Sequence, residues 1–402
     1  MDYNSGLRSI LFITLVCWSC GPQLESDSRH ISKDAIVINV DTSSINDSTD
    51  ISAFIADLEI IPLKEHKDDF IGEVWKVILA RDYVIVFDRY ITKRIHVYKK
   101  NGEIFKSIVP EGDGPNQFLQ ISDCWINERG NLEVYDFQLN RVIVFDHNFQ
   151  PKRSFKGRNH LFFNSVQNIG GKYVGFGGYN DYNGSFRGKY YKVAVMDTNF
   201  KVQKTVFHFD KKLRGAIIST PINPFGKIEE KTIFYQDYDQ NIYNVNTSGD
   251  FDLRYRLNYT PNPIPEDFDG QVVTKHLSLF KSAQIDFENI DKIYKGYSGF
   301  RGPWFEANDF VVFNSFDVSY NRFSSIYDKK GKKIIAQGRF LFDNKNKFTI
   351  PYFHTVDPQN NSFIAVIEGY IIFNHIKKGS TYFDQFEDWE DENFYLIKVT
   401  LN

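Results

Sequence analysis

The residues that could ligate a metal or act as acids and bases are spread widely along the chain. Nine histidines occur among 402 residues, and none belongs to a His-x-His or His-Glu-x-x-His arrangement, which are typical of zinc sites. A ring-shaped fold could still gather distant ligands where its innermost strands begin. Asp123, Glu306 and His354 fall at such positions and are the metal-site candidates. Calcium is the possible metal, and the alternative for each residue is an ordinary satisfied hydrogen bond.

Two segments mix aromatic rings with polar groups in a way that suits ligand binding. Residues 177–191 form a connection that is long for a hairpin, and long loops in compact domains are often functional. Residues 299–308 have a similar composition. Tyrosine offers a flat apolar face with a polar tip, which suits sugars and peptides, although such rings could equally pack between sheets. The ligand-binding candidates are Tyr179, Asp181, Tyr182, Arg301 and Trp304.

The N-terminal segment predicts export and a lipid anchor. Residues 8–20, RSILFITLVCWSC, contain an apolar run too short to span a bilayer, as in a secretory signal. A small residue, Ser19, precedes Cys20, so we predict a lipoprotein signal peptide over residues 1–19 and lipid attachment at Cys20. A plain secretory signal cut elsewhere is the alternative. Residues 20–54 are polar and predicted to be a flexible tether, so the membrane is reached only through the lipid.

The overall composition favours a sheet protein with no affinity for nucleic acid. The chain has 23 Tyr and 38 Phe against 2 Met, and aromatic residues suit a pleated, half-buried surface. The net charge is −3, from 48 basic and 51 acidic residues, and no basic stripe indicates a nucleic-acid partner. A glycan, a peptide or another envelope protein remains a possible partner.

One phrase, an alternating strand followed by a short polar turn, recurs along the chain. Anchored on Gly102, Phe149, Phe200 and Gly249, the repeats are 47, 51 and 49 residues apart. Periods of about 40 to 50 residues with four strands each are typical of propeller blades. The sequence therefore predicts an all-β, six-bladed β-propeller over residues 55–402, in which the phrase is the outer hairpin of each blade. Similar hairpins in a β-sandwich are the alternative.

Two further features fix the predicted connectivity. The spacing to the next repeat, at Gly331, is 82 residues, and residues 265–283 show helical periodicity. We therefore expect a helical insertion between blades four and five, packed on the outside. Residues 57–65 lack a strand partner before them and residues 394–401 lack one after them. Pairing the N-terminal strand with the last blade would close the ring and remove exposed sheet edges.

The order of several short motifs resembles a known family. LEIIPLKE at 58–65, the Gly-x-Gly-Pro turn at 112–115 and the helical insertion are similar to those of six-bladed β-propeller lipoproteins abundant in gut-dwelling Gram-negative bacteria. The resemblance covers roughly residues 55–402. It implies a propeller lipid-anchored in the cell envelope, at the outer membrane, facing either the periplasm or the cell surface. Its motifs are structural, and the family offers no catalytic residues to carry over.

Two functions follow as hypotheses. The first is a lipid-anchored envelope propeller that binds a ligand or partner protein at one face of the ring without catalysis. The second is a periplasmic or surface enzyme, hydrolase- or lyase-like, with an axial metal assembled from several blades. The missing catalytic signature favours the first.

Overall fold

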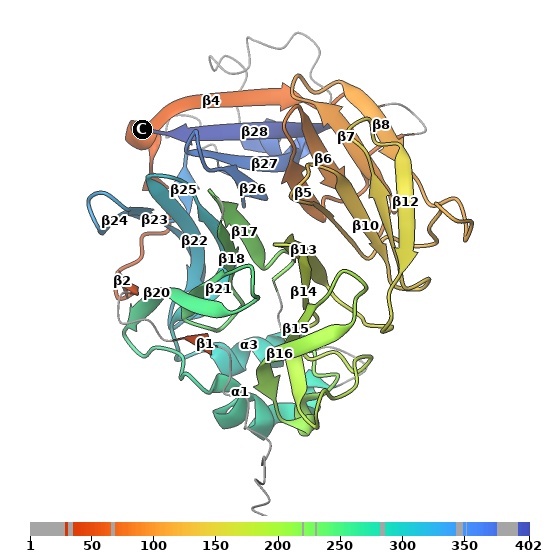
Figure 1. Cartoon of the computed structure of the whole chain (residues 1–402). Coiled ribbons are helices and arrows are strands. Elements are labelled where there is room, and N and C mark those ends of the chain that lie inside the picture. The colour runs from red at the N-terminus through yellow and green to blue at the C-terminus, as the bar shows by residue number, and fades with distance from the viewer. Residues whose placement is uncertain are drawn as a thin grey trace, which may run out of the picture.

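Six sheets radiate from a central axis in the computed structural model of the chain (Figure 1). The structure describes residues 29–30, 35–65, 69–218, 221–229, 231–281, 286–342, 349–350, 352–375 and 393–402. The predicted signal peptide and Cys20 lie outside these residues. Within the described residues, no helix is both long and apolar enough to cross a membrane.

The first three blades are four-stranded antiparallel sheets that follow one another in sequence. Blade 1 consists of β5 (Lys76–Leu79), β6 (Tyr83–Phe87), β7 (Ile95–Lys99) and β8 (Ile104–Ile108). Blade 2 consists of β9 (Asp123–Ile126), β10 (Leu132–Asp136), β11 (Arg141–Phe145) and β12 (Pro151–Lys156). Blade 3 consists of β13 (Ser165–Ile169), β14 (Lys172–Phe176), β15 (Tyr190–Met196) and β16 (Val202–Phe209).

The last three blades repeat this order, with the first strand of each nearest the axis (Figure 1). Blade 4 consists of β17 (Phe225–Ile228), β18 (Lys231–Phe234), β19 (Asn241–Val245) and β20 (Phe251–Thr260). Blade 5 consists of β21 (Gly299–Glu306), β22 (Phe310–Phe316), β23 (Arg322–Asp328) and β24 (Lys333–Gly338). Blade 6 consists of β26 (Thr355–Asp357), β27 (Ser362–Glu368), β28 (Phe394–Leu401) and β4 (Ile55–Pro62). The predicted six-bladed propeller is confirmed.

The recurring phrase is the hairpin between the third and fourth strands of a blade. Gly102, Phe149, Phe200 and Gly249 adopt positive φ values of 84°, 55°, 57° and 79°, as a hairpin with a left-handed residue and a bulge requires. In each of these hairpins the pairing of the third and fourth strands also contains a register shift, which lies within the third strand. In blade 5 the left-handed residue is Lys332, one position after the predicted Gly331.

The ring closes as the sequence predicts. β4 pairs antiparallel with β28 over residues 55–62 and 395–401, so both ends of the propeller lie in one sheet. The hydrophobic core consists of one layer between each pair of neighbouring blades. The many aromatic residues fill these layers, since a blade cannot bury both faces alone.

The segment before β4 is built into the propeller. β2 (Ile36–Asp41) pairs in parallel with β20 along the outer edge of blade 4. β3 (Thr49–Asp50) then pairs with β25 (Phe340–Leu341), and β1 (Arg29–His30) pairs with the start of β20. The prediction of a flexible tether is therefore wrong for residues 35–54, because the open edge of β20 supplies hydrogen bonds that offset the cost of ordering them.

The helical insertion lies between blades four and five, as predicted. It contains α1 (Phe268–Gln271), η3 (Val273–His276), α2 (Leu277–Phe280) and α3 (Phe287–Tyr294). It does not pack on the outside of the ring. Phe268 and Tyr294 join a buried cluster with Tyr179, Tyr238 and Phe316, which lie at or just after the ends of the second strands of blades 3, 4 and 5. A further helix, α4 (Gly369–His375), follows β27 in blade 6.

The strand order gives the ring two distinct faces. The connections between strands one and two and between strands three and four lie on one side, here called the hairpin face. The connections between strands two and three and from one blade to the next lie on the other, here called the crossover face. The helical insertion belongs to the crossover face, because it connects the last strand of blade 4 to the first strand of blade 5.

Candidate functional site

The axis is closed by polar contacts on the side of blades 1 to 3. Lys76 Nζ at the start of β5 lies 2.9 Å from Asp123 Oδ1 at the start of β9 and donates to the Cys124 carbonyl at 2.8 Å. The other carboxylate oxygen of Asp123 accepts the Val166 N–H of β13 at 2.7 Å. Asp123 thus ties three innermost strands together, and its oxygens are already occupied by these contacts.

On the side of blades 4 to 6 the axis opens into a cavity of about 690 Å³. It lies towards the crossover face, between the innermost strands and the segments that lead into them. Its volume is typical of a small-molecule site. The polar and aromatic groups on its wall include Glu73, Trp75, Tyr235, Asp237, Arg301, Asn314, Arg322, Arg339, Tyr352, His354 and Glu368.

The blade 1 side of this cavity is held in place by a buried carboxylate. Asp88, at the end of β6 and fully buried, accepts the backbone N–H groups of Gly72 and Glu73 at 2.8 and 3.0 Å. These bonds fix the strand-like segment that presents Glu73 and Trp75 to the cavity. Burial and the charge of Asp88 raise the pKa of Glu73 above its ordinary value.

His354 lines the cavity and carries a buried hydrogen-bond donor. Its Nδ1 accepts the Val366 N–H at 3.1 Å, so in the neutral ring the proton resides on Nε2. That nitrogen is shielded from solvent and has no hydrogen-bond partner among the described residues, as is also true of Trp75 Nε1. Burial lowers the pKa of His354 to about 3, so the ring stays neutral and a donor at physiological pH.

Charges of both signs surround these donors. Arg301, Arg322 and Arg339 line the cavity together with Glu73 and Glu368. Tyr352, half exposed, lies edge-on to the His354 ring with 4.9 Å between ring centroids. Burial, followed by the charges of Glu368 and Glu73, raises the pKa of the Tyr352 hydroxyl. The cavity can therefore meet a polar ligand with cations, carboxylates, neutral donors and an aromatic face.

The three metal-site candidates are not brought together. Asp123 contacts Lys76, and Glu306 lies between blades 4 and 5, where Arg254 Nη2 and Lys329 Nζ approach Oε1 at 2.5 and 3.0 Å. His354 alone faces the cavity. Within the described part of the chain no group of three His, Cys, Asp or Glu side chains could hold a metal ion.

Two of the ligand-binding candidates serve the core instead. Tyr179 is buried, its hydroxyl donates to Asp269 of the insertion, and Lys192 Nζ lies 4.3 Å from its ring centroid. Trp304 is buried between blades 4 and 5, with its ring centroid 5.1 Å from that of Tyr255. Neighbouring elements cover both rings, and ligand contact at these two residues stays a prediction.

The other three candidates lie on the crossover face, with Arg301 apart from Asp181 and Tyr182. Arg301 lines the axial cavity, with its guanidinium 5.2 Å from the Tyr320 ring centroid. Asp181 and Tyr182 lie in the connection after β14, and Tyr182 is 67% exposed. The Tyr182 ring packs against Phe162, with 5.2 Å between centroids. It therefore belongs to an exposed aromatic patch outside the cavity.

Sequence reasoning missed Trp75, Tyr352 and Arg339. A usable signal existed for the first, because Trp75 immediately precedes the first innermost strand, within the motif IGEVWKV. Residues at that position reach the axis in a propeller. No comparable signal marks Tyr352 or Arg339, since each is placed by a connection between blades 5 and 6 whose length does not repeat elsewhere.

The sheets, their order and their closure define a six-bladed β-propeller with an axial cavity on the crossover face. The chain belongs to the family described as "Domain of unknown function (DUF4934)", whose profile matches residues 35–399. The match includes β2, in agreement with its place in the folded domain. No curated protein matches the chain in sequence.

Comparison with solved structures finds matches from several bacteria. A Bacteroides fragilis protein described as a "putative exported protein" is 13% identical, with a TM-score of 0.71 over 92% of this chain and 99% of that one. A DUF4221 family member from Bacteroides vulgatus is 8% identical, with a TM-score of 0.49 over 87% and 97%. Virginiamycin B lyase from Staphylococcus aureus is 10% identical, with a TM-score of 0.39 over 86% and 99%. At these identities the likeness to the first concerns the fold alone.

Proposed function

We propose that the protein is an exported, lipid-anchored propeller of the cell envelope that binds a polar organic ligand, a glycan or peptide segment, in its axial cavity. The observation that carries this proposal is the cavity of about 690 Å³, with two side-chain donors, His354 Nε2 and Trp75 Nε1, that lack partners among the described residues. Buried donors are normally hydrogen-bonded. A ligand acceptor that reached either nitrogen would supply the missing partner.

The chemistry of the wall supports binding rather than catalysis. A general base or nucleophile would need an activated partner, and His354 is held as a neutral donor by its bond to Val366. The arginines and carboxylates on the wall are suited to orient a ligand that carries charged or hydroxyl groups. Phe305, Phe342 and Phe353 supply apolar contact beside them.

Two sequence features support the envelope location. The segment at residues 8–20 has the features of a lipoprotein signal, and Cys20 is the proposed acylation site. The "exported" description of the Bacteroides fragilis protein agrees with this. Labelling cells with a radioactive fatty acid tests the anchor: the label should vanish in Cys20→Ala and persist in Cys17→Ala. Equal labelling of the wild type and Cys20→Ala would refute it.

A ligand screen with two matched variants tests the cavity. We would screen neutral and charged oligosaccharides and short peptides for thermal stabilisation of the purified full chain in detergent. A ligand of the cavity should bind Tyr352→Ala about tenfold less tightly, because stacking and hydrogen-bond contacts of this size contribute on the order of 1.4 kcal/mol. Its affinity for Tyr182→Ala should be unchanged, since Tyr182 lies on the same face outside the cavity.

The reverse result would relocate the site. A ligand that loses affinity for Tyr182→Ala and not for Tyr352→Ala would place binding at the exposed aromatic patch. A screen in which no probe stabilises the wild type, or in which both variants behave as the wild type does, would contradict the proposal.

A further inference from the structure

A second pocket, of about 560 Å³, lies on the opposite face of the ring. It is formed where blades 2 and 3 meet, by the β9–β10 turn, the start of β12, the β13–β14 turn and the β15–β16 hairpin. These connections all belong to the hairpin face, so this pocket is distinct from the axial cavity. Its volume is sufficient for a sugar ring or a comparable small molecule.

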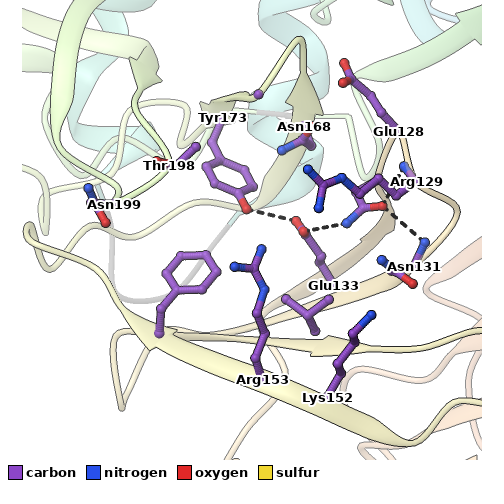
Figure 2. A pocket seen from close by; sticks show the side chains of 14 residues that line it. Glu128, Arg129, Asn131, Glu133, Lys152, Arg153, Asn168, Tyr173, Thr198 and Asn199 are labelled. Atoms are coloured by element: carbon purple, nitrogen blue, oxygen red, sulfur yellow. Dashed lines mark hydrogen bonds between the residues drawn. The ribbon is translucent and has the colours of Figure 1, made fainter.

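A buried carboxylate forms the floor of this pocket (Figure 2). Glu133 is only 2% exposed. It accepts hydrogen bonds from Trp125 Nε1 at 2.9 Å, from the Tyr173 hydroxyl at 3.0 Å and from Asn127 Nδ2 at 2.7 Å. All three donors are uncharged. Burial and the charge of Glu133 raise the pKa of Tyr173, which keeps its hydroxyl protonated and able to donate.

Three cations surround the carboxylate without forming an ion pair within the described residues. Arg129, Lys152 and Arg153 line the pocket, and all three are exposed. The Arg153 guanidinium points inward beside Glu133 (Figure 2) and lies 5.9 Å from the Phe155 ring centroid. The second carboxylate, Glu128, accepts the Gly170 N–H. The pocket therefore holds more positive than negative charge.

The remaining wall is built from amides, a hydroxyl and aromatic rings. Asn131, Asn168, Asn199 and Thr198 line it beside Phe155 and Tyr173. Amide and hydroxyl groups can both donate to and accept from ligand hydroxyls, and an aromatic ring gives a flat apolar face to a sugar. Arginine binds carboxylate and sulfate groups with two parallel hydrogen bonds.

We propose that this pocket binds an acidic saccharide, a hydroxyl-rich ring that carries a carboxylate or a sulfate group. The anionic group would contact Arg153 and Lys152, and the ring hydroxyls would contact Glu133 and the asparagine amides. The proposal does not depend on the axial cavity, because the two pockets lie on opposite faces and share no lining residue.

Calorimetric titration of the purified full chain in detergent tests the proposal. The probes are a galacturonate trisaccharide, galactose 6-sulfate and the uncharged galactose trisaccharide. We expect the wild type to bind at least one charged probe and to bind the uncharged one more weakly. High salt should lower the affinity for the charged probe, because salt screens exposed charges. The relative affinities of the carboxylated and sulfated probes identify the anionic group.

Matched variants assign the binding to this pocket. Arg153→Ala and Lys152→Ala should each lower the affinity for the charged probe about tenfold, which corresponds to the loss of one hydrogen bond to a charged group. Lys212→Ala removes the same charge from an exposed position on the crossover face and should leave the affinity for the charged probe unchanged. His354→Gln, in the axial cavity, should also bind normally.

Three outcomes would overturn the proposal. The first is that neither charged probe binds, and the second is that the uncharged trisaccharide binds as tightly as they do. The third is that Arg153→Ala and Lys152→Ala bind like the wild type while retaining its melting temperature. Because Lys152 and Arg153 are exposed, both variants should fold, so a loss of binding can be read directly.

Discussion

The interfaces between blades 2 and 3 and between blades 4 and 5 each bury one glutamate on the hairpin face. Glu133 is 2% exposed and Glu306 is 3% exposed. Glu306 receives Arg254 and Lys329 at 2.5 and 3.0 Å, together with the Tyr255 hydroxyl at 2.8 Å. Among the described residues, Glu133 receives only neutral donors, and the cations beside it lie at the wall of an open pocket.

The difference separates a structural carboxylate from one available to a ligand. Burial alone raises the pKa of Glu306, but the hydrogen bonds and charges of Arg254 and Lys329 outweigh this effect and hold it below its ordinary value. A buried charge that is fully paired can hold two blades together. A buried carboxylate can instead contact a bound ligand when it borders an open pocket and the cations beside it form no ion pair among the described residues.

Removing the charge of Glu306 should produce the largest loss of stability. Glu306→Gln leaves Arg254 and Lys329 near a buried site without a counter-charge, and breaking a buried ion pair costs about 3 kcal/mol. Urea unfolding measures this loss. The matched control is Glu133→Gln, where one of three neutral donors loses its acceptor, at a cost of about 1 kcal/mol. Equal losses in the two variants would contradict the distinction between the interfaces.

At low pH the contribution of Glu306 to the free energy of unfolding should be lost. Its folded-state pKa lies below the ordinary value of 4.5, so its stabilising contribution is complete above that value. The contribution is lost as pH falls through the lowered folded-state pKa. The difference in unfolding free energy between the wild type and Glu306→Gln should be constant from about pH 5 upwards and shrink below it. A difference that grows on acidification would show that the assigned sign is wrong.

The repeated parts of the fold could be predicted from sequence, and the parts that occur once could not. The outer hairpins show a period because Gly102, Phe149, Phe200 and Gly249 all occupy the same left-handed position. β2 was not predicted from the sequence. It is a six-residue strand among polar residues, and it forms because the edge of β20 offers it a pairing partner. The side on which the insertion packs was mispredicted, since it depends on loops of three blades.

The candidate sites were harder to predict because their partners are distant in sequence. Glu133 meets Tyr173 forty positions away in the next blade, and Arg254 meets Glu306 across 52 positions. Neither pairing leaves a local motif. Loop composition singled out Arg301, which lines the axial cavity, but could not separate exposed Tyr182 from buried Tyr179, because burial is decided by the insertion.

The smallest expected effect on stability is that of Arg153→Ala. Comparing it with Arg254→Ala tests the difference between the two interfaces through their arginines rather than their glutamates. Arg153 and Arg254 lie on the outer strands of blades 2 and 4. Arg254→Ala deprives a buried carboxylate of a two-point contact and should cost at least about 1 kcal/mol. Arg153→Ala removes an exposed cation that has no ion pair among the described residues, so the unfolding free energy should change by less than about 0.5 kcal/mol. If urea unfolding instead gave equal losses, Arg153 would have a structural role, and the positive charge beside Glu133 would serve the fold as it does beside Glu306.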